Sequence, residues 1–193
     1  MMRIILASGS PRRRELLKSL GLEFEVYKPD VDEHALDDES PSELCTRLSR
    51  LKAHAGAEKF HDSLIIAADT IVVIDDLILG KPKDRHDAFM MLKRLQGRWH
   101  EVITGVSVCM KGNIISHDEH TQVKFRELSD SEIQAYISTG ECDDKAGAYA
   151  VQGYGSLLVE RIDGDYFNVV GLPLCSLGMM LRTFGINILG GHS

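Results

Sequence analysis

The chain has 193 residues, of which 44% are hydrophobic and 26% charged, an ordinary composition for a globular protein with a sizeable core. Its formal net charge of −7 argues against broad binding to nucleic-acid backbones or anionic membranes. No apolar run approaches the roughly 18 residues that a bilayer requires. Four widely spaced cysteines without a C-x-x-C pair, and an N-terminus without a secretory pattern, predict reduced thiols in a cytoplasmic protein.

The first expected elements are a strand, a short turn and a helix. Residues 4–7 form an apolar strand, and a helical pattern covers residues 11–20 before Gly21 ends it. Pro11 suits the first helical position because its φ angle is already helical, and Ser10 before it is a favoured N-cap residue. The chain therefore turns sharply from the strand into the helix.

This turn has the features of an anion site. It collects backbone N–H groups, the hydroxyls of Ser8 and Ser10 and the positive end of a helix dipole, with Arg12 and Arg13 in the first helical turn. Phosphate is the favoured anion. The alternative is a purely structural cap followed by solvated arginines, and the chain contains neither a Walker-type loop nor a G-x-G-x-x-G motif.

Apolar periodicity and capping residues predict alternating strands and helices in the rest of the chain. Strands are expected over residues 22–26, 64–68, 71–74, 77–79, 102–110, 114–115, 121–125 and 157–162. Helices are expected after Ser40, Asp84 and Ser129 and over residues 174–184, the first with an apolar stripe of Leu44, Leu48, Leu51 and Ala55. The pattern predicts an α/β fold with a mixed sheet flanked by helices, in a single domain over residues 1–193.

Asp69 is the second informative residue. It stands between two apolar strand segments, where a carboxylate is costly unless it is paired or binds a metal. Ligands of α/β sheets bind at the carboxyl ends of strands, where Asp69 is expected to lie. It is therefore a candidate metal ligand or general base, and a turn-capping aspartate is the structural alternative.

Two further candidates lie in loops. Gly80-Lys81-Pro82 places a cation on a rigid turn, either to neutralise phosphate or as an ordinary surface lysine. Asp32 and Glu33 lie in an acidic loop, and either could supply one of the few carboxylates that Mg²⁺ takes beside substrate phosphates. A solvated acidic loop is the alternative for this pair.

A flexible, glycine-rich segment follows later in the chain. It joins Lys145 to Gln152, whose amide both donates and accepts and so could read the edge of a base. The run from His117 to His120 suggests a metal cluster at first sight. Residues three apart point to opposite faces of an extended chain, so we expect a solvated surface there.

Together these segments resemble the Maf family of nucleoside triphosphate pyrophosphatases. The matching segments occur in the family's order and cover almost the whole chain: Ala7–Arg13, Val31–Glu33, Ala67–Val72, Gly80–Pro82, Asp144–Tyr149 with Gln152-Gly153, and Val170–Leu174. The resemblance implies a fold like that of the inosine triphosphate pyrophosphatases, with an elongated mixed sheet and two lobes around a cleft. It also implies cleavage of a nucleotide between its α and β phosphates, giving a monophosphate and pyrophosphate.

The resemblance extends to the dTTP/UTP branch of the family. Asp69-Thr70 and the loop from Lys145 to Gln152 are similar to that branch, which implies that Arg12, Thr70 and Gln152 set substrate choice and that Asp69 is the catalytic base. It further implies a house-cleaning role towards dTTP, UTP and modified pyrimidine nucleotides, and a homodimer. The 7-methyl-GTP branch, and a nucleotide-sensing regulator of septum formation without turnover, are the alternatives.

The chemistry of the side chains fits this reading. Attack by water on a polyphosphate needs its charges neutralised, and Ser8, Arg13, Lys52, Lys81 and Lys145 are the expected phosphate-binding residues. Glu33 and Asp69 are the expected ligands of Mg²⁺, for which Mn²⁺ or Co²⁺ can substitute. A tight metal ligand is a poor base, so the role of Asp69 stays open between the two.

Overall fold

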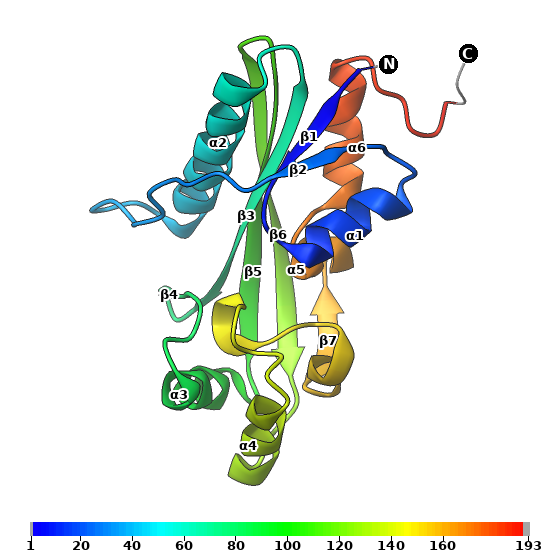
Figure 1. Ribbon diagram of the computed structural model, residues 1–193. Helices are drawn as coiled ribbons and strands as arrows, with labels where there is room; N and C mark the ends of the chain where they lie inside the picture. Colours follow the sequence, from blue (N-terminus) through cyan, green and yellow to red (C-terminus); the bar gives the residue numbers. More distant parts are fainter. Residues whose placement is uncertain (1, 191–193) are drawn as a thin grey trace. The chain divides into compact units, whose positions relative to one another are not determined.

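Three parallel strands begin the sheet in the computed structural model, which describes residues 2–190. Strand β1 (Ile4–Ala7) pairs in parallel with both β2 (Glu25–Tyr27) and β3 (Leu64–Ile74). The seven-stranded sheet has the order β2-β1-β3-β5-β6-β7, with β4 on β3 (Figure 1). The remaining strands are β4 (Leu77–Leu79), β5 (Trp99–Met110), β6 (Asn113–Phe125) and β7 (Val159–Asp163). Because β3–β4 and β6–β7 are antiparallel, the predicted mixed sheet is confirmed.

Four helices begin where the capping residues predict, whereas the short helix α5 was not predicted. The helices are α1 (Pro11–Ser19), α2 (Pro41–Lys59), α3 (Arg85–Leu95), α4 (Asp130–Ser138), α5 (Tyr166–Val170) and α6 (Leu174–Thr183), with 3₁₀ turns η1 (Ala146–Ala148) and η2 (Gly153–Leu157). The side chains of Ser10, Ser40, Asp84 and Ser129 each accept a hydrogen bond from the N–H three residues ahead. None of the helices within residues 2–190 is both long enough and apolar enough to cross a bilayer.

The structure divides into two compact units. Unit 1 comprises the chain up to Asp69, Thr104–Glu119 and the chain from Gly171 on, and unit 2 comprises Thr70–Ile103 and His120–Val170. The boundaries fall inside β3, β5 and β6, so these strands contribute residues to both units. The expectation of a single domain over residues 1–193, and of a cleft between lobes, stays a prediction.

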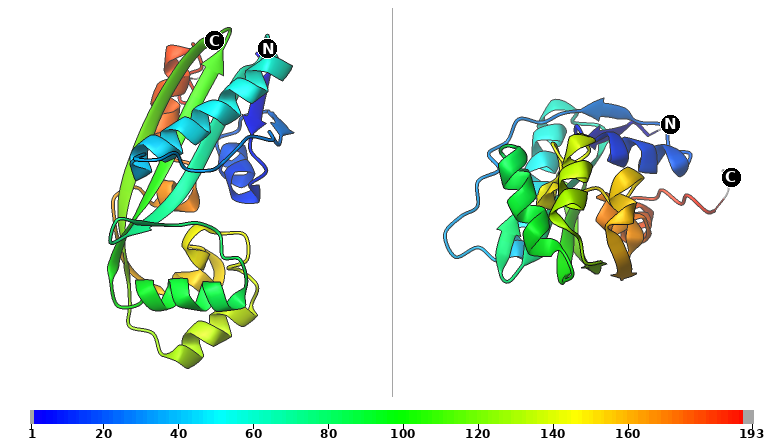
Figure 2. Two further views of the ribbon diagram at one scale, coloured as in Figure 1. Left: turned by 90° about the vertical axis from the view of Figure 1, so that its left-hand side faces the viewer. Right: turned by 90° about the horizontal axis from the view of Figure 1, so that it is seen from below.

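In unit 1, helices cover both faces of the parallel strands. The connections from β1 to β2 and from β2 to β3 run in opposite directions along the sheet. Since such crossovers are almost always right-handed, α1 and α2 must lie on opposite faces. Figure 2 shows α2 on one side of the strands and α1 with α6 on the other. The core under α2 consists of Ile5, Ala7, Ala53, Ile65, Ala67 and Cys109.

Unit 2 has its own core. Helix α3 packs against α4 and η1. The largest fully buried side chains of this core include Phe125, Leu92, Leu95 and Ile133. The loop that carries Lys145 lies against this core, because Ala146, Ala148 and Tyr149 pack into it.

The predicted strand breaks at residues 69–70 and 116–120 are wrong. Strand β3 runs unbroken through Asp69, so this residue lies within a strand rather than at its end. The strand continues because β4 pairs with its far half, at Val72–Ile74, whereas β1 pairs with its first three residues. Strand β6 is likewise continuous, and its exposed positions are mostly polar, with the exposed Ile115 as an exception.

The predicted apolar stripe of α2 is partly wrong. Leu44 and Leu48 are buried, but Leu51 is 37% exposed and the small residues Cys45, Ser49, Ala53 and Gly56 face the sheet instead. The helix lies too close for larger side chains: a Cβ on Gly105 of β5 would come within 2.3 Å of the Cys45 carbonyl oxygen. A hydrogen bond of 2.7 Å between the hydroxyls of Ser49 and Ser107 joins the same two elements.

This close approach predicts that Gly105→Ala destabilises the fold by about 1–3 kcal/mol, because the added methyl group must push α2 away from β5. Urea denaturation measures the change in the free energy of unfolding. Gly178→Ala is the matched control, since a Cβ there on α6 meets nothing within 4 Å. The control should be neutral or stabilising by up to about 1 kcal/mol. Equal stability of the two variants would contradict the close contact.

Candidate active site

The turn after β1 is held by a buried hydroxyl and an arginine. Ser8 Oγ accepts hydrogen bonds from the Ser10 N–H and from Arg13 Nη1, both at 3.2 Å. Arg13 Nε donates to the carbonyl oxygen of Gly171 at 2.7 Å. The guanidinium therefore ties the turn to the segment before α6. The Ser8 hydroxyl predicted to bind phosphate thus already orders the turn.

The charges around Arg13 place further predicted residues nearby. Burial lowers the pKa of the Arg13 guanidinium, and Arg12 adds to this, whereas Asp69 and Glu33 act in the opposite direction. An arginine stays protonated under these influences. Two arginines and two carboxylates of unit 1 are therefore close enough to act on one another.

Lys52 lies between the two carboxylates. Its Nζ is 2.7 Å from Glu33 Oε1 and 2.5 Å from Asp69 Oδ1. The side chains of Lys52 and Asp69 are only 11% and 14% exposed, while that of Glu33 is 53% exposed. Helix α2 thus supplies a lysine whose ammonium is held by one carboxylate from the loop after β2 and one from strand β3. Water reaches the ammonium mainly from the Glu33 side.

The loop that carries Glu33 has its own supports. Asp32 Oδ1 accepts the His34 N–H at 3.0 Å, and this contact together with the His34 ring lowers the pKa of Asp32. Arg47 Nη2 donates to the His34 carbonyl oxygen at 2.9 Å. Asp32 therefore caps a local turn, and Glu33 is the residue that reaches Lys52. The sequence alone cannot tell these two carboxylates apart. No motif in the sequence pointed to Arg47.

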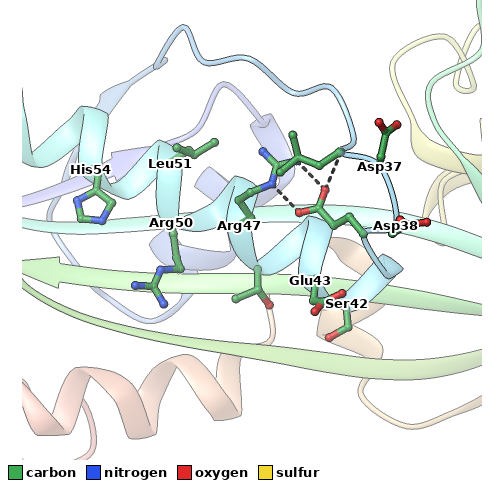
Figure 3. Close-up of a pocket in the computed structure, with 11 residues that line it drawn as sticks. Asp37, Asp38, Ser42, Glu43, Arg47, Arg50, Leu51 and His54 are labelled. Atoms are coloured by element: carbon green, nitrogen blue, oxygen red, sulfur yellow. Dashed lines mark hydrogen bonds and ion pairs between the residues drawn. The ribbon is translucent and has the colours of Figure 1, made fainter.

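Arg47 also closes a hollow on the outer side of α2 (Figure 3). Its guanidinium binds both carboxylate oxygens of Glu39, at 2.5 and 2.8 Å, and Glu39 Oε2 accepts the Leu36 N–H at 3.1 Å. The lining residues are Leu36, Asp37, Asp38, Glu39, Ser42, Glu43, Thr46, Arg47, Arg50, Leu51 and His54. None of the predicted site residues lines this hollow, so we assign Arg47 the role of fixing the loop that carries Glu33.

In unit 2, two predicted lysines come from neighbouring segments. The Gly147 N–H donates to the Gly80 carbonyl oxygen at 3.1 Å, which fixes the turn of Lys81 beside the loop of Lys145. Lys81 is exposed, whereas Lys145 is 15% exposed and pairs with Asp144. Gly147 has a φ of +68°, and a Cβ there would meet Val72 at 3.0 Å, so only glycine fits this approach to β3.

The remaining predicted residues are Thr70 and Gln152. Thr70 directly follows Asp69 on β3 and is half-buried. Gln152 is exposed between η1 and η2. His117 and His120 lie on β6 beside Glu119 and Glu101, at 3.5 and 3.3 Å. Within the described residues 2–190, no group of three or more His, Cys, Asp and Glu side chains could hold a metal ion.

Comparison with known proteins identifies the family. The sequence pattern of the family described as Maf-like protein matches residues 3–184. The chain belongs to the Maf family. The resemblance drawn from its sequence motifs is thereby confirmed.

Maf-family relatives of high similarity cover the chain almost end to end. A relative from Thermoanaerobacter sp. (strain X514) is 52% identical over 192 residues, which cover 97% of this chain and 100% of the relative. A relative from Clostridioides difficile (strain 630) is 48% identical over 194 residues, which cover 98% and 100%. Both carry the name dTTP/UTP pyrophosphatase.

Solved structures show a more distant likeness. A HAM1 protein from Coxiella burnetii is 16% identical with a TM-score of 0.48, covering 65% of this chain and 73% of its own. A nucleoside-triphosphatase, dITP/XTP pyrophosphatase, from Mycobacterium abscessus is 12% identical with a TM-score of 0.47, covering 95% and 97%.

Proposed function

We propose that this protein is a nucleoside triphosphate pyrophosphatase that hydrolyses dTTP and UTP, and modified pyrimidine nucleotides as further substrates, to the monophosphate and pyrophosphate. The names of its relatives support the reaction and the substrates. The observation that carries the proposal is the group of Arg13, Glu33, Lys52 and Asp69, which combines cations for a polyphosphate with a sheltered carboxylate for water.

Each predicted residue takes a role within this proposal. We assign phosphate binding to Ser8, Arg13, Lys52, Lys81 and Lys145, because cations and a hydroxyl can neutralise or hold the oxygens of a polyphosphate. Choice of the nucleotide belongs to Arg12, Thr70 and Gln152. Among these, the exposed amide of Gln152 offers a donor and an acceptor on separate atoms, which suits it to the edge of a base.

Asp69 is the candidate that activates water. A carboxylate oxygen takes a proton from the attacking water, a new P–O bond forms, and the bond between the α phosphorus and the leaving pyrophosphate oxygen breaks. Asp69 is sheltered from bulk solvent, which strengthens its interaction with nearby charges.

The residues present also fit a divalent cation. Glu33 and Asp69 already share one ammonium ion between oxygens at 2.7 and 2.5 Å, and oxygen donors are the ligands that Mg²⁺ prefers. Two carboxylates suffice where substrate phosphates and water complete the shell. When bound, Mg²⁺ or its substitutes Mn²⁺ and Co²⁺ polarise the phosphoryl group and lower the pKa of water. The Lys52 ammonium must leave its position between the carboxylates to admit the ion.

This competition predicts that Lys52→Met raises the affinity for Mn²⁺ in the absence of nucleotide by about tenfold, which corresponds to about 1.4 kcal/mol. Removing the ammonium leaves Glu33 and Asp69 without their shared cation, while turnover falls because a phosphate-binding charge is lost. Electron paramagnetic resonance of free Mn²⁺ measures the affinity. Lys18→Met, on the exposed face of α1, changes net charge equally and serves as the control. Unchanged or weaker Mn²⁺ binding in Lys52→Met would contradict the competition.

The proposed function is tested by release of pyrophosphate from a nucleotide panel with Mg²⁺. We expect turnover of dTTP and UTP well above that of purine triphosphates. Turnover confined to 7-methyl-GTP would move the protein to the other branch of the family. No turnover of any triphosphate would refute the enzymatic proposal.

We further propose a cytoplasmic homodimer that binds neither nucleic acid nor membrane and removes aberrant nucleotides as a house-cleaning enzyme. The net charge of −7 supports the exclusion of polyanionic partners. Light scattering measures the mass in solution, and a gel shift at moderate salt tests nucleic-acid binding. We propose that residues 1–193 form one domain, for which a single cooperative unfolding transition is expected.

A further inference from the structure

The segment that carries Gln152 is fixed from the end of helix α4. The Tyr136 hydroxyl accepts a hydrogen bond from the Ala150 N–H at 3.0 Å. Glu141 Oε1 accepts the Tyr154 N–H at 2.9 Å, and Glu141 Oε2 accepts the Gly155 N–H at 3.1 Å. One side chain thus holds the backbone before Gln152, and one carboxylate uses both oxygens to hold the backbone after it.

The Glu141 carboxylate lies directly against the turn that it holds. Gly153 has a φ of +64°, and a Cβ at this position would lie 2.3 Å from Glu141 Oε1. The backbone of Glu141 is itself fixed, because its N–H donates to Thr139 Oγ1 at 3.2 Å. A segment that its glycines predict to be flexible is therefore tied to α4, immediately beyond Gln152.

The Gln152 side chain contrasts with this rigid backbone. It is exposed and makes no hydrogen bond to the part of the chain that the structure describes, residues 2–190. Its direction therefore depends on the φ and ψ angles of the segment. An amide discriminates between bases only when its donor and acceptor face complementary groups on the base, because a site built for one hydrogen-bond pattern rejects partners that leave its groups unpaired.

We propose that Glu141 is a positioning residue for nucleotide choice: its carboxylate, bound to the N–H groups of Tyr154 and Gly155, fixes the backbone that aims the Gln152 amide at the base. The inference rests on the proposed function, since it assigns a base to Gln152. Glu141 touches neither phosphate nor water in this scheme. It should therefore affect which nucleotide binds, and leave the groups around Asp69 in unit 1 unchanged.

The test uses the full-length protein with Mg²⁺ and the α,β-imido analogues of dTTP and dATP, whose binding is measured by calorimetry. Glu141→Ala should narrow the ratio of the two dissociation constants by about tenfold, the effect of about 1.4 kcal/mol. Glu141→Gln keeps the shape and one acceptor, and should restore part of the ratio. Glu160→Gln on β7 removes an exposed carboxylate of the same unit and should leave the ratio unchanged.

A double-mutant cycle with Gln152→Ala separates positioning from general stabilisation. If Glu141 acts through Gln152, adding Glu141→Ala to Gln152→Ala should change the ratio less than twofold, because the amide that it aims is already absent. If the double variant instead shows the product of the two single effects on the ratio, the substitutions act independently and the proposal is overturned. Equal weakening of both analogues by Glu141→Ala, with the ratio preserved, would also overturn it.

The binding readout keeps this inference distinct from the proposed function. If the wild-type protein binds the dTTP analogue selectively but releases no pyrophosphate, the enzymatic proposal fails and the role of Glu141 stands or falls on the cycle. If the wild-type protein binds both analogues equally, the assignment to Gln152 and Glu141 is refuted. Should Glu141→Ala fail to fold, Glu141→Gln supplies both the ratio and the cycle.

Discussion

Asp69→Asn should lower kcat for dTTP by about a hundred- to ten-thousandfold, the range typical of a lost general base. The amide keeps the size of the carboxylate and a contact with Lys52, but it neither takes a proton from water nor carries charge. Lys52 retains Glu33 as an ion-pair partner at 2.7 Å, so the fold should survive. Pyrophosphate release measures kcat, and wild-type activity in Asp69→Asn would remove Asp69 from the mechanism.

The same variant distinguishes the two roles left open for Asp69. If Asp69 is the base and not a ligand, Mn²⁺ affinity should change little, and excess Mn²⁺ should not restore the rate. If Asp69 is a metal ligand, Mn²⁺ affinity should fall by about 10- to 100-fold, and excess Mn²⁺ should restore part of the rate. Asp62→Asn, an exposed carboxylate shortly before β3, is the matched control and should change neither quantity.

The local features of this fold could be predicted from the sequence. The capping boxes at Ser40 and Ser129 each join residues three apart, so the sequence contains both partners. The turn from β1 into α1 is equally local, because Ser10 caps the helix and Pro11 begins it. Such elements depend on neighbours in the chain, which a single sequence displays.

Features set by distant contacts could not be predicted in this way. Asp69 and Thr70 are polar residues between apolar runs and therefore suggest a turn, yet β4 and the rest of the sheet keep β3 extended through them. The stripe on α2 depends on how near that helix comes to Gly105 of β5. Local periodicity does not reveal which strand pairs with which, nor how closely a helix approaches the sheet.

The candidate site shows the same division. Asp32 and Glu33 are indistinguishable in an acidic loop, but in the structure Glu33 reaches Lys52 while Asp32 caps the turn at His34, whose carbonyl oxygen binds Arg47. The sequence marks Lys52 as a cation for phosphate, but its position between two carboxylates follows from how α2 lies against β3. The sequence therefore suggests which residue types take part, and long-range packing determines which of them meet.

The second large effect concerns stability in acid, through a buried histidine of unit 2. His100 is 3% exposed and packs edge-on against Phe125 and Tyr149, with its Nε2 2.8 Å from the Tyr149 hydroxyl. Its Nδ1 is buried without a hydrogen-bond partner among the described residues. Protonation would place an unsatisfied charge in this core, so burial lowers the pKa of His100 from 6.5 to about 3.

A histidine whose pKa is lower in the folded state loses stability as the pH falls, because the unfolded chain binds the proton first. The free energy of unfolding should fall by about 1.4 kcal/mol per pH unit below the unfolded pKa. The fall continues until the folded pKa is reached, giving roughly 4–5 kcal/mol in total. Between pH 6.5 and 5, where ordinary carboxylates remain ionised, this one residue should contribute about 2 kcal/mol.

His100→Gln tests this origin of acid sensitivity. Its amide can keep a hydrogen bond to Tyr149 but does not titrate, so the variant should be less stable than wild type at pH 7 and show a flatter dependence between pH 6.5 and 5. Urea denaturation at each pH measures how steeply the free energy of unfolding changes with pH. This slope does not depend on the stability difference between the variants at pH 7. His61→Gln, at an exposed position after α2, should keep the wild-type slope. If His100→Gln keeps it as well, the proton that destabilises the fold binds elsewhere.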